Sequence, residues 1–547
     1  MLVGKKSLME MRYKVKNNKR KIGFGLMLSL LLAAMIQLSV CAANITVTVS
    51  GCVITGNNVT VTATTAAVPA TADGLYYLFE LKPYETAVGA RKNYCATAPA
   101  AAAAVFTTPL NYNTADSKLY SRFVVTVLQN GSYVPVSNEM YITNPEALAT
   151  KATNYPVRSK KGLTADWRFS DELASLGAGY ASYELDVSRF FQGGGLNYTY
   201  NGRTYSFNAA VVREYDVICS RLAASGCNVI MIIKNSYNKS TLDMIAPTGR
   251  AAGKNCYAFN VDEQIPTEKL EALMSFLANR YSGSMGTIHT WVIGNEVNSS
   301  NPWHYMGNVS ADTLAAHYAK EFRVCYNAIK SQNKGARVFI DIDQRWNFED
   351  GTRGQFAARK ILDQFASYIS ISGNIDWGLS FHPYPVPIYN CSFWSLPANY
   401  ARMNLIDHTD NSKFVNPANT DVVTNHMMLP TMLAPNGGVR HILITEMGFT
   451  SYSTKIPTNE LTQAAAIVFA YKLTSSNPLI EGIVFHRQVD HAAELHSDGM
   501  ALGIRTETGV KYAYGVFANM DRGNSPQYTD FALPILGVSS WAELGLK

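Results

Sequence analysis

The segment 211–233, VVREYDVICSRLAASGCNVIMII, places a helical stretch directly before a short buried strand. Residues 211–224 have the spacing of an amphipathic helix, and residues 228–233 form a largely apolar run. An apolar run of this length is typical of a strand buried on both faces, as in a parallel sheet. The same order of apolar runs and amphipathic stretches continues from about residue 150 onward. The pattern therefore predicts an α/β fold built on a parallel sheet.

Eight strand candidates follow one another in this part of the chain, and helical stretches separate several of them. The strand candidates are residues 160–163, 180–186, 228–233, 289–295, 337–341, 377–382, 441–446 and 482–486. The helical stretches are residues 211–224, 268–281, 311–330, 355–368 and 460–473. No glycine-rich nucleotide-binding motif follows the early strands. We therefore predict a (β/α)₈ TIM barrel with insertions over residues 151–547.

The region before the barrel has a different sequence pattern, in which threonine and valine alternate with a period of two. The alternation is clear in residues 45–50 and 59–64, and turn residues such as Asn130-Gly131 separate further short strands. Such strands predict a small all-β sandwich of Ig or fibronectin type at residues 44–147, in the role of a spacer or accessory module. Cys52 and Cys95 lie in this region and either pair in an exported protein or remain two buried thiols.

The first 21 residues carry eight basic side chains against Glu10, which accounts for more than the whole chain's formal net charge of +6. We therefore infer no nucleic-acid surface from that charge. An apolar run at residues 22–40 and the small residues Ala42 and Ala43 follow. This order predicts a signal peptide at residues 1–42 and an extracellular or cell-surface protein. The run is also long enough to serve as a membrane anchor if it is retained.

Two strand candidates end in a carboxylate. One is Trp291-Val-Ile-Gly-Asn-Glu296, and the other is Ile442-Leu-Ile-Thr-Glu446. The carboxyl ends of the strands of a barrel converge on one face, so these two side chains can face each other. A pair of carboxylic acids is what retaining glycoside hydrolysis needs, one to protonate the leaving oxygen and one to attack the anomeric carbon. Each glutamate taken alone is more simply explained as a capped turn or a stability residue.

The sequence here resembles clan A of the glycoside hydrolases. The resemblance rests on Gly294-Asn295-Glu296 at a fourth strand, Thr445-Glu446-Met447-Gly448 at a seventh, and Phe381-His382-Pro-Tyr384 at a sixth. It covers residues 150–520 or so and implies Glu296 as acid/base and Glu446 as nucleophile. It also implies that Asn295 donates to the sugar 2-hydroxyl and that Tyr384, with His382, stands beside the nucleophile. Aromatic packing is the alternative for His382 and Tyr384.

This chain departs from the clan at the end of the eighth strand. The clan often has a tryptophan there, whereas this chain has Phe485-His486-Arg487, so we count His486 among the substrate-binding residues. No clear counterpart is found of the arginine that many members carry on strand two. Trp303, Trp346 and Trp394 follow strands four, five and six and are candidates for stacking on sugar rings. Anchoring of their own loops is an equal alternative for each.

A further motif is the tyrosine-rich stretch at residues 196–207, in which Asn201-Gly202 separates two alternating aromatic runs. This pattern predicts a β-hairpin with a type I′ turn. Because it follows the second strand, we expect it at the carboxyl-end face of the barrel, lining the cleft. The alternative is that it packs on its own barrel as a structural brace.

Two other classes of function compete with glycoside hydrolysis. Metal-dependent hydrolysis lacks its usual motifs, since the first strand has no His-x-His and the chain has no HExxH. We therefore expect neither a metal nor a cofactor. The remaining alternative is a catalytically inactive carbohydrate-binding or cell-surface barrel. The sequence thus predicts a monomeric exported enzyme with an oligosaccharide or polysaccharide substrate, no nucleic-acid partner, and a membrane contact only through a retained leader.

Overall fold

The computed structural model describes residues 46–156 and 158–546. The predicted signal peptide at residues 1–42 lies outside this range, so its cleavage and its possible role as an anchor stay predictions. Within the described part of the chain, no helix combines the length and the apolar character that crossing a bilayer requires.

Eight parallel strands form a closed barrel, which confirms the predicted TIM fold. Each strand pairs with the next in the order of the chain, and the eighth pairs with the first. The strands are β9 (Lys161–Thr164), β10 (Tyr180–Asp186), β13 (Asn228–Lys234), β16 (Thr290–Ile293), β17 (Arg337–Asp343), β18 (Gly378–His382), β19 (Ile442–Met447) and β20 (Ile480–Phe485). All eight coincide with the strand candidates to within a few residues at either end.

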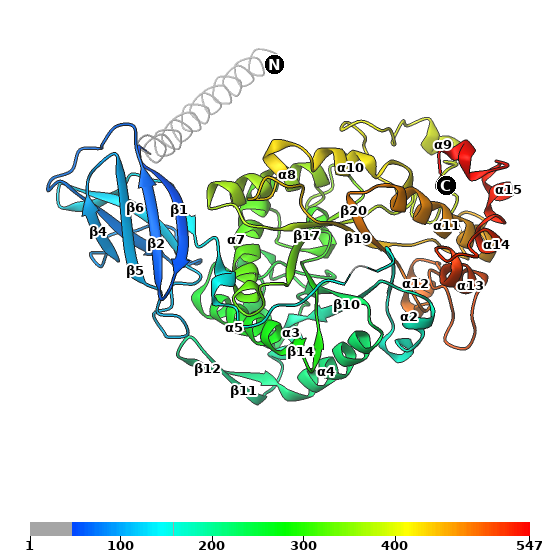
Figure 1. Ribbon diagram of the computed structural model, residues 1–547, viewed down its shortest axis with the longest axis horizontal. Coiled ribbons are helices and arrows are strands. Elements are labelled where there is room, and N and C mark those ends of the chain that lie inside the picture. The colour runs from blue at the N-terminus through cyan, green and yellow to red at the C-terminus, as the bar shows by residue number, and fades with distance from the viewer. Residues whose placement is uncertain (1–45, 157, 547) are drawn as a thin grey trace, which may run out of the picture.

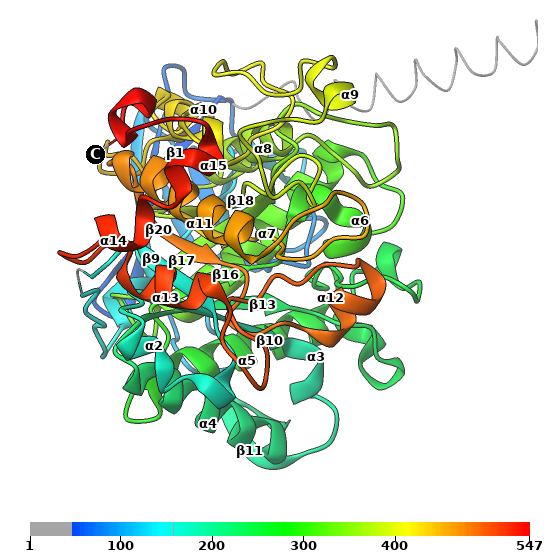
Figure 2. The ribbon, with the colours of Figure 1, turned by 90° about the vertical axis from the view of Figure 1, so that its right-hand side faces the viewer.

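Helices surround the barrel, as Figure 2 shows, and cover the outer face of its strands. Side chains cap several of them at the first turn: Asn208 caps α4, Ser310 caps α7 and Asn459 caps α11. The main helices are α4 (Ala209–Ala224), α5 (Gln264–Arg280), α7 (Ala311–Lys330), α8 (Ala358–Ile371), α11 (Glu460–Ser476) and α13 (Tyr512–Asn519).

The inside of the barrel is packed with side chains from most of its strands. One buried cluster joins Tyr180, Ile230, Ile232, Val292, Phe339, Leu443 and Val484. Glycines on three strands leave room for its two largest members. A Cβ at Gly162 or Gly482 would collide with Tyr180, and one at Gly378 would collide with Phe339. The interior is therefore a solid core, which leaves the carboxyl-end mouth as the place for a site.

Two antiparallel sheets precede the barrel and lie to its left in Figure 1. One contains β1 (Thr48–Thr55), β2 (Asn58–Thr64) and β5 (Ala103–Pro109). The other contains β4 (Ala96–Pro99), β3 (Leu75–Leu81), β6 (Arg122–Gln129), β7 (Ser132–Pro135) and β8 (Met140–Tyr141). Alternate residues of β2 and β5 are buried, as the period of two predicts. Cys52 and Cys95 are both free thiols in this structure.

The tyrosine-rich hairpin forms as predicted, from β11 (Gly195–Tyr200) and β12 (Arg203–Asn208), but its expected position in the cleft is wrong. The hairpin bridges the N-terminal sheets and the barrel instead. The hydroxyl of Tyr200 lies 2.7 Å from that of Tyr120, and the backbone N–H of Asn201 donates to Asn113 at 3.2 Å. On its other side, the ring of Phe207 packs 5.2 Å from that of Phe276 on α5. The hairpin is therefore a brace between the two parts of the molecule.

Candidate active site

Glu296 lies just beyond the end of β16, at the mouth of the barrel. Its backbone is left-handed, with φ 42° and ψ 54°, a conformation that costs a non-glycine residue about 1–2 kcal/mol. Its backbone N–H donates to Asp341 Oδ2 at 2.8 Å, which fixes this turn. Gly294 precedes it with φ 80°, and a Cβ there would come within 2.9 Å of the His304 ring. The strand can therefore turn sharply enough to direct Glu296 into the mouth only with glycine at position 294.

Glu446 is the fifth residue of β19, where the pairing of β19 with β20 is irregular between Ile444 and Met447. Such irregularities change the direction in which side chains point, and they are common beside active sites. Tyr384 donates its hydroxyl hydrogen to Glu446 Oε1 at 2.5 Å. On another side of the carboxylate, His486 Nδ1 lies 3.8 Å from the same oxygen. Glu446 is thus held by one hydrogen-bond donor and faced by one imidazole.

His382 is completely buried and links Glu296 to the side chains beneath it. Its Nδ1 lies 2.9 Å from Glu296 Oε1, and its Nε2 lies 3.1 Å from both Asp341 Oδ1 and Thr445 Oγ1. Ser380 also hydrogen-bonds both Asp341 and Thr445. Strands four to seven of the barrel are therefore tied together directly beneath the two glutamates.

The two glutamates differ in the protonation state that their surroundings favour. Burial raises the pKa of Glu296 to about 7, with further contributions from the charges of Asp343 and Glu446, and His382 offsets only part of this rise. Burial acts on Glu446 in the same direction, but the charges of His486 and His382 outweigh it. Together with the Tyr384 hydrogen bond they lower the pKa of Glu446 to about 2. One carboxyl is thus suited to donate a proton and the other to stay ionised.

His382 itself favours the protonated form. Burial by itself would lower its pKa, but the charges of Asp341 and Glu446 and the hydrogen bonds to Asp341 and Glu296 raise the pKa well above the ordinary value. A protonated imidazole can donate from both nitrogens, one to Glu296 and one to the Asp341 and Thr445 oxygens. His382 therefore supplies a fixed positive charge between the two glutamates.

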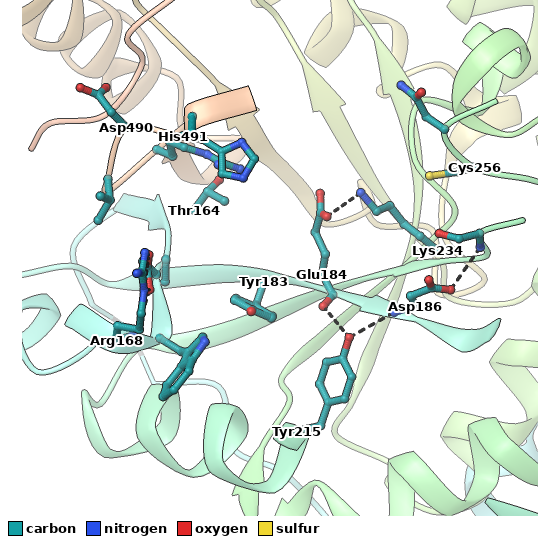
Figure 3. A pocket seen from close by; sticks show the side chains of 18 of the residues that line it. Thr164, Arg168, Tyr183, Glu184, Asp186, Tyr215, Lys234, Cys256, Asp490 and His491 are labelled. Carbon is teal, nitrogen blue, oxygen red and sulfur yellow. Dashed lines mark hydrogen bonds and ion pairs between the residues drawn. The ribbon is translucent and has the colours of Figure 1, made fainter. Parts of the chain in front are cut away.

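A cavity of 720 Å³ opens beside this pair, over the ends of strands eight, one, two and three (Figure 3). Its wall includes Trp167, Tyr183, Lys234, Trp303 and Arg487, together with Thr164, Ala165, Asp166, Arg168, Glu184, Asp186, Arg189, Tyr215, Ser236, Asn255, Cys256, Val489, Asp490, His491, Ala492 and Glu507. Neither Glu296 nor Glu446 lines it directly. Both carboxylates are nevertheless partly exposed, at 13% and 18% of their side-chain surface.

Two residues connect the cavity to Glu446. Lys234 lies in its wall and contributes to lowering the pKa of Glu446, and Thr164 contacts the Nδ1 of His486 at 3.3 Å. The charged side chains of the wall are mostly paired: Lys234 with Glu184 at 2.5 Å, and Arg168 with Asp166 at 2.6 Å. The cavity therefore presents polar groups and aromatic faces without a large charge of either sign.

The structure brings most of the site residues expected from sequence to this mouth. Asn295 is buried directly before Glu296, and in the part of the chain that the structure describes its side-chain amide makes no hydrogen bond. Trp303 lines the 720 Å³ cavity. His382, Tyr384 and His486 contact the two glutamates as described above.

The structure excludes the stacking role that the sequence allowed for Trp346. Its side chain is only 1% exposed, and its Nε1 donates to the backbone carbonyl of Asp410 at 3.3 Å. Its ring packs edge-on against His426 at 5.0 Å. An indole enclosed in this way offers no face to a sugar, so Trp346 anchors its loop. Trp394 lines a different cavity, away from the glutamates.

Trp303 is the one wall residue that was predicted as a site residue from sequence, and the residues that were missed include Trp167, Tyr183 and Lys234. Lys234 could have been found, because it directly follows the predicted strand 228–233 and so lies at the carboxyl-end mouth of the barrel. Trp167 follows the first strand in a short loop, and nothing in the local pattern distinguishes it from other loop tryptophans.

The comparisons with known proteins place the chain in a family. Residues 153–544 match the model of a family described as "Family of unknown function (DUF5722)". Among curated proteins, none matches this chain.

The solved structures to which this chain is similar include three glycosidases. The first is a family 39 glycoside hydrolase from Bacteroides cellulosilyticus WH2, with 14% identity, coverage of 84% of this chain and 79% of that chain, and a TM-score of 0.45. The second is a hyperthermophilic beta-glucosidase from Pyrococcus furiosus, with 14% identity, 68% and 88% coverage, and a TM-score of 0.42. The third is a β-glucuronidase from Ruminococcus gnavus, with 10% identity, 86% and 67% coverage, and a TM-score of 0.35.

Proposed function

We propose that this chain, which belongs to the DUF5722 family, is an exported retaining glycoside hydrolase that cleaves β-linked glycosides or polysaccharides. Glu296 is its acid/base and Glu446 its nucleophile. The observation that carries the proposal is a pair of glutamates at one barrel mouth whose surroundings favour opposite protonation states, with His382 contacting Glu296 and Tyr384 donating to Glu446. That division of roles is what two-carboxylate glycoside hydrolysis requires.

The reaction proceeds in two steps at the anomeric carbon. In the first, Glu446 attacks that carbon while Glu296 gives its proton to the departing glycosidic oxygen, which leaves as an alcohol. A covalent bond now joins the sugar to Glu446. In the second step, Glu296 takes a proton from a water molecule, whose oxygen attacks the anomeric carbon and releases Glu446 as a carboxylate. Two inversions restore the original configuration, and Glu296 ends protonated again.

The surrounding residues have separate tasks in this scheme. Tyr384 keeps the nucleophile ionised and oriented through its hydrogen bond to Glu446. Asn295 donates to the sugar 2-hydroxyl, since its amide is not engaged by any of the residues that the structure describes. Trp303 and Trp167 supply aromatic faces in the cavity wall, where sugar rings can stack. Retention further requires the two carboxyl groups to stand about 5–5.5 Å apart, whereas inversion needs roughly 6.5–9.5 Å.

We further propose that the N-terminal region, residues 44–147, is a sandwich module of Ig or fibronectin type that serves as a spacer for the catalytic barrel at residues 151–547. Its two antiparallel sheets and their alternating burial support this assignment. Export rests on the basic and apolar leader, and it places the enzyme outside the cell or at its surface.

The test of this function is a screen of the purified protein against aryl β-glycosides and plant, fungal and host glycans. Turnover of at least one substrate by the wild type, with none by Glu446→Gln, is the expected result. For Glu296→Ala we expect loss of activity on substrates with poor leaving groups, while activated aryl glycosides still react and added azide restores turnover as a glycosyl azide. Binding of an oligosaccharide without any turnover would instead indicate an inactive carbohydrate-binding barrel.

A further inference from the structure

A second cavity lies at the junction between the N-terminal sheets and the barrel, and we call it the junction cavity. Its volume is 310 Å³, at the lower end of the range of about 300–1,000 Å³ that small-molecule sites occupy. Its wall is formed by the loops that follow β3 and precede β6, by the hairpin β11–β12 and by the first half of α5. None of these wall residues lines the 720 Å³ cavity at the barrel mouth, so the two cavities are separate.

Several polar groups in the wall of the junction cavity have no partner inside the protein. Ser117 Oγ and Asn201 Oδ1 are buried atoms that make no hydrogen bond with any described residue. Glu271 is only 6% exposed, and its carboxyl has neither a hydrogen bond nor an ion pair within the described part of the chain. Buried polar groups are nearly always hydrogen-bonded, because an unpaired one lowers stability. Three such groups around one cavity favour a ligand that is rich in hydrogen-bonding groups.

Two tyrosines, Tyr84 and Tyr205, are half-buried in the same wall. Tyr205 belongs to β12, and Tyr84 belongs to the loop that follows β3. Among the described residues, neither ring packs against another aromatic ring and neither hydroxyl makes a hydrogen bond. A tyrosine offers an apolar ring face and a polar tip, which match the C–H face and the hydroxyl groups of a sugar ring. The wall therefore combines aromatic surface with free hydrogen-bonding groups.

The charges of the wall favour a neutral ligand over an ion. Arg203 pairs with Glu268, and Lys82 lies 3.8 Å from Glu80. Burial raises the pKa of Glu271 to about 8, so this carboxyl is mostly protonated at pH 7 and can both donate and accept a hydrogen bond. A cation in the cavity would approach Lys82 and Arg203, and an anion would approach Glu268. A neutral hydroxylated molecule avoids both repulsions.

We propose that the junction cavity binds one unit of a neutral oligosaccharide and so forms a second carbohydrate site, apart from the catalytic one. Glu271 and Asn201 bond its hydroxyl groups, and the rings of Tyr84 and Tyr205 contact its apolar face. Arg203 is 52% exposed, so the cavity opens to solvent beside the hairpin, where a longer chain can extend. The choice of a sugar among hydroxylated ligands rests on the function proposed above, whereas the cavity and its unpaired groups do not.

The experiment is isothermal titration calorimetry with neutral oligosaccharides of glucose, xylose, mannose and galactose. All variants are made in Glu446→Gln protein, so that a bound sugar is not hydrolysed. We expect at least one oligosaccharide to bind, and its affinity to fall roughly tenfold in Glu271→Met, which loses the hydrogen bonds of the carboxyl. Glu271→Gln still donates and accepts hydrogen bonds and should bind the sugar almost as tightly as the parent protein.

A second variant, Tyr84→Ala, tests the aromatic part of the wall, and we expect a similar fall in affinity. Its matched control is Tyr528→Ala, because Tyr528 is also half-buried but lies on α14 (Pro526–Thr529), at the other end of the molecule in Figure 1. Glu271→Met leaves no other group without a partner, so both it and Tyr84→Ala should keep the fold, which circular dichroism checks.

Sugar binding that Trp303→Ala abolishes but that neither Glu271→Met nor Tyr84→Ala weakens would place the sugar at the barrel mouth alone and overturn the proposal. The absence of any sugar binding would overturn it too, and would leave the junction cavity to water. Binding of ethylammonium as a probe in place of every sugar would show a cation site instead. If the junction variants lose the sugar as expected but the wild type hydrolyses no glycoside, the junction site stands and the proposed function fails.

Discussion

At the scale of single residues, the site works because different neighbours face two chemically identical side chains. Glu296 is surrounded by buried and acidic groups, and its pKa rises to about 7. Glu446 is faced by His486, His382 and the Tyr384 hydroxyl, and its pKa falls to about 2. The same residue type thus serves as an acid at one position and as a nucleophile at the other.

A pH profile follows from these two values. Activity requires Glu296 protonated and Glu446 ionised, so kcat/KM should be flat at mildly acidic pH and fall above about pH 7, where Glu296 loses its proton. The decline should approach tenfold per pH unit on substrates with poor leaving groups. For activated aryl glycosides, which need little help from an acid, the alkaline limb should be much weaker. Identical alkaline limbs for both substrate classes would count against Glu296 as the acid.

Tyr384→Phe removes the donor to Glu446 and leaves the ring in place. A hydrogen bond to a charged group contributes about 1.5–3 kcal/mol, so kcat/KM should fall roughly 10- to 100-fold and the acid limb should move to higher pH. Tyr452→Phe is the control, since Tyr452 is 53% exposed. Equal activity of the two variants would show that the Tyr384 hydroxyl has no role.

At the scale of elements, the strands could be predicted from the sequence, whereas the position of the hairpin could not. Apolar runs such as residues 228–233, alternating with helical stretches, predicted the strands, and the structure closes these strands into a barrel. The hairpin β11–β12 formed as its Asn201-Gly202 turn predicted. Its packing partner, however, is a surface made by Tyr120 and α5, which lie far away in the chain. Local pattern cannot indicate such a partner.

The bracing role of the hairpin leads to a stability prediction. Tyr200→Phe leaves the buried hydroxyl of Tyr120 without its partner and should lower the free energy of unfolding by about 1–3 kcal/mol. Hydrolysis of a small aryl glycoside should stay at the wild-type rate. Urea denaturation and initial rates provide the two measurements. A loss of affinity for substrate without a loss of stability would contradict the bracing role and indicate that the hairpin contacts the substrate.

At the scale of the whole molecule, the two parts of the chain meet at a cavity of 310 Å³ between the N-terminal sheets, the hairpin and α5. Glu271 lies in its wall, is only 6% exposed, and has no ion-pair partner among the described residues. Burial raises the pKa of Glu271 to about 8. The folded protein therefore keeps a proton there that the unfolded chain releases at its ordinary value of 4.5.

Because the pKa of Glu271 is raised in the folded protein, its contribution to the free energy of unfolding becomes less favourable at alkaline pH. Between pH 4.5 and 8 the folded state binds one more proton at Glu271 than the unfolded state does, so its contribution to stability falls as the pH rises. Glu271→Gln keeps the neutral form at every pH. It should therefore be more stable than the wild type by about 4 kcal/mol at pH 8, and should lose this advantage at pH 4.5. A difference that is the same at both pH values would show that Glu271 is not neutral in the folded protein.

The site shows the same division between what sequence can and cannot predict. Glu296 and Glu446 ended predicted strands, so their convergence followed from barrel closure, and the structure places His382 in contact with Glu296 and with Thr445, the residue before Glu446. For Trp346 the sequence left open both stacking on a sugar and anchoring of its own loop, and the contact with Asp410 in the structure favours anchoring. Trp167 follows strand one and lines the cavity together with residues that follow strand eight, such as Arg487 and Val489. Contacts made by chain segments far apart in sequence decide both outcomes.

The central claim is that Glu446 becomes covalently attached to the sugar, and mass spectrometry of a trapped intermediate tests it most directly. The protein is incubated with a 2-deoxy-2-fluoro glycoside of whichever sugar the aryl glycoside screen identifies, then digested and sequenced. We predict one added sugar, located on the peptide that contains Glu446, with no label in Glu446→Gln. A label on any other residue, or hydrolysis of the substrate with no label at all, would contradict the assignment.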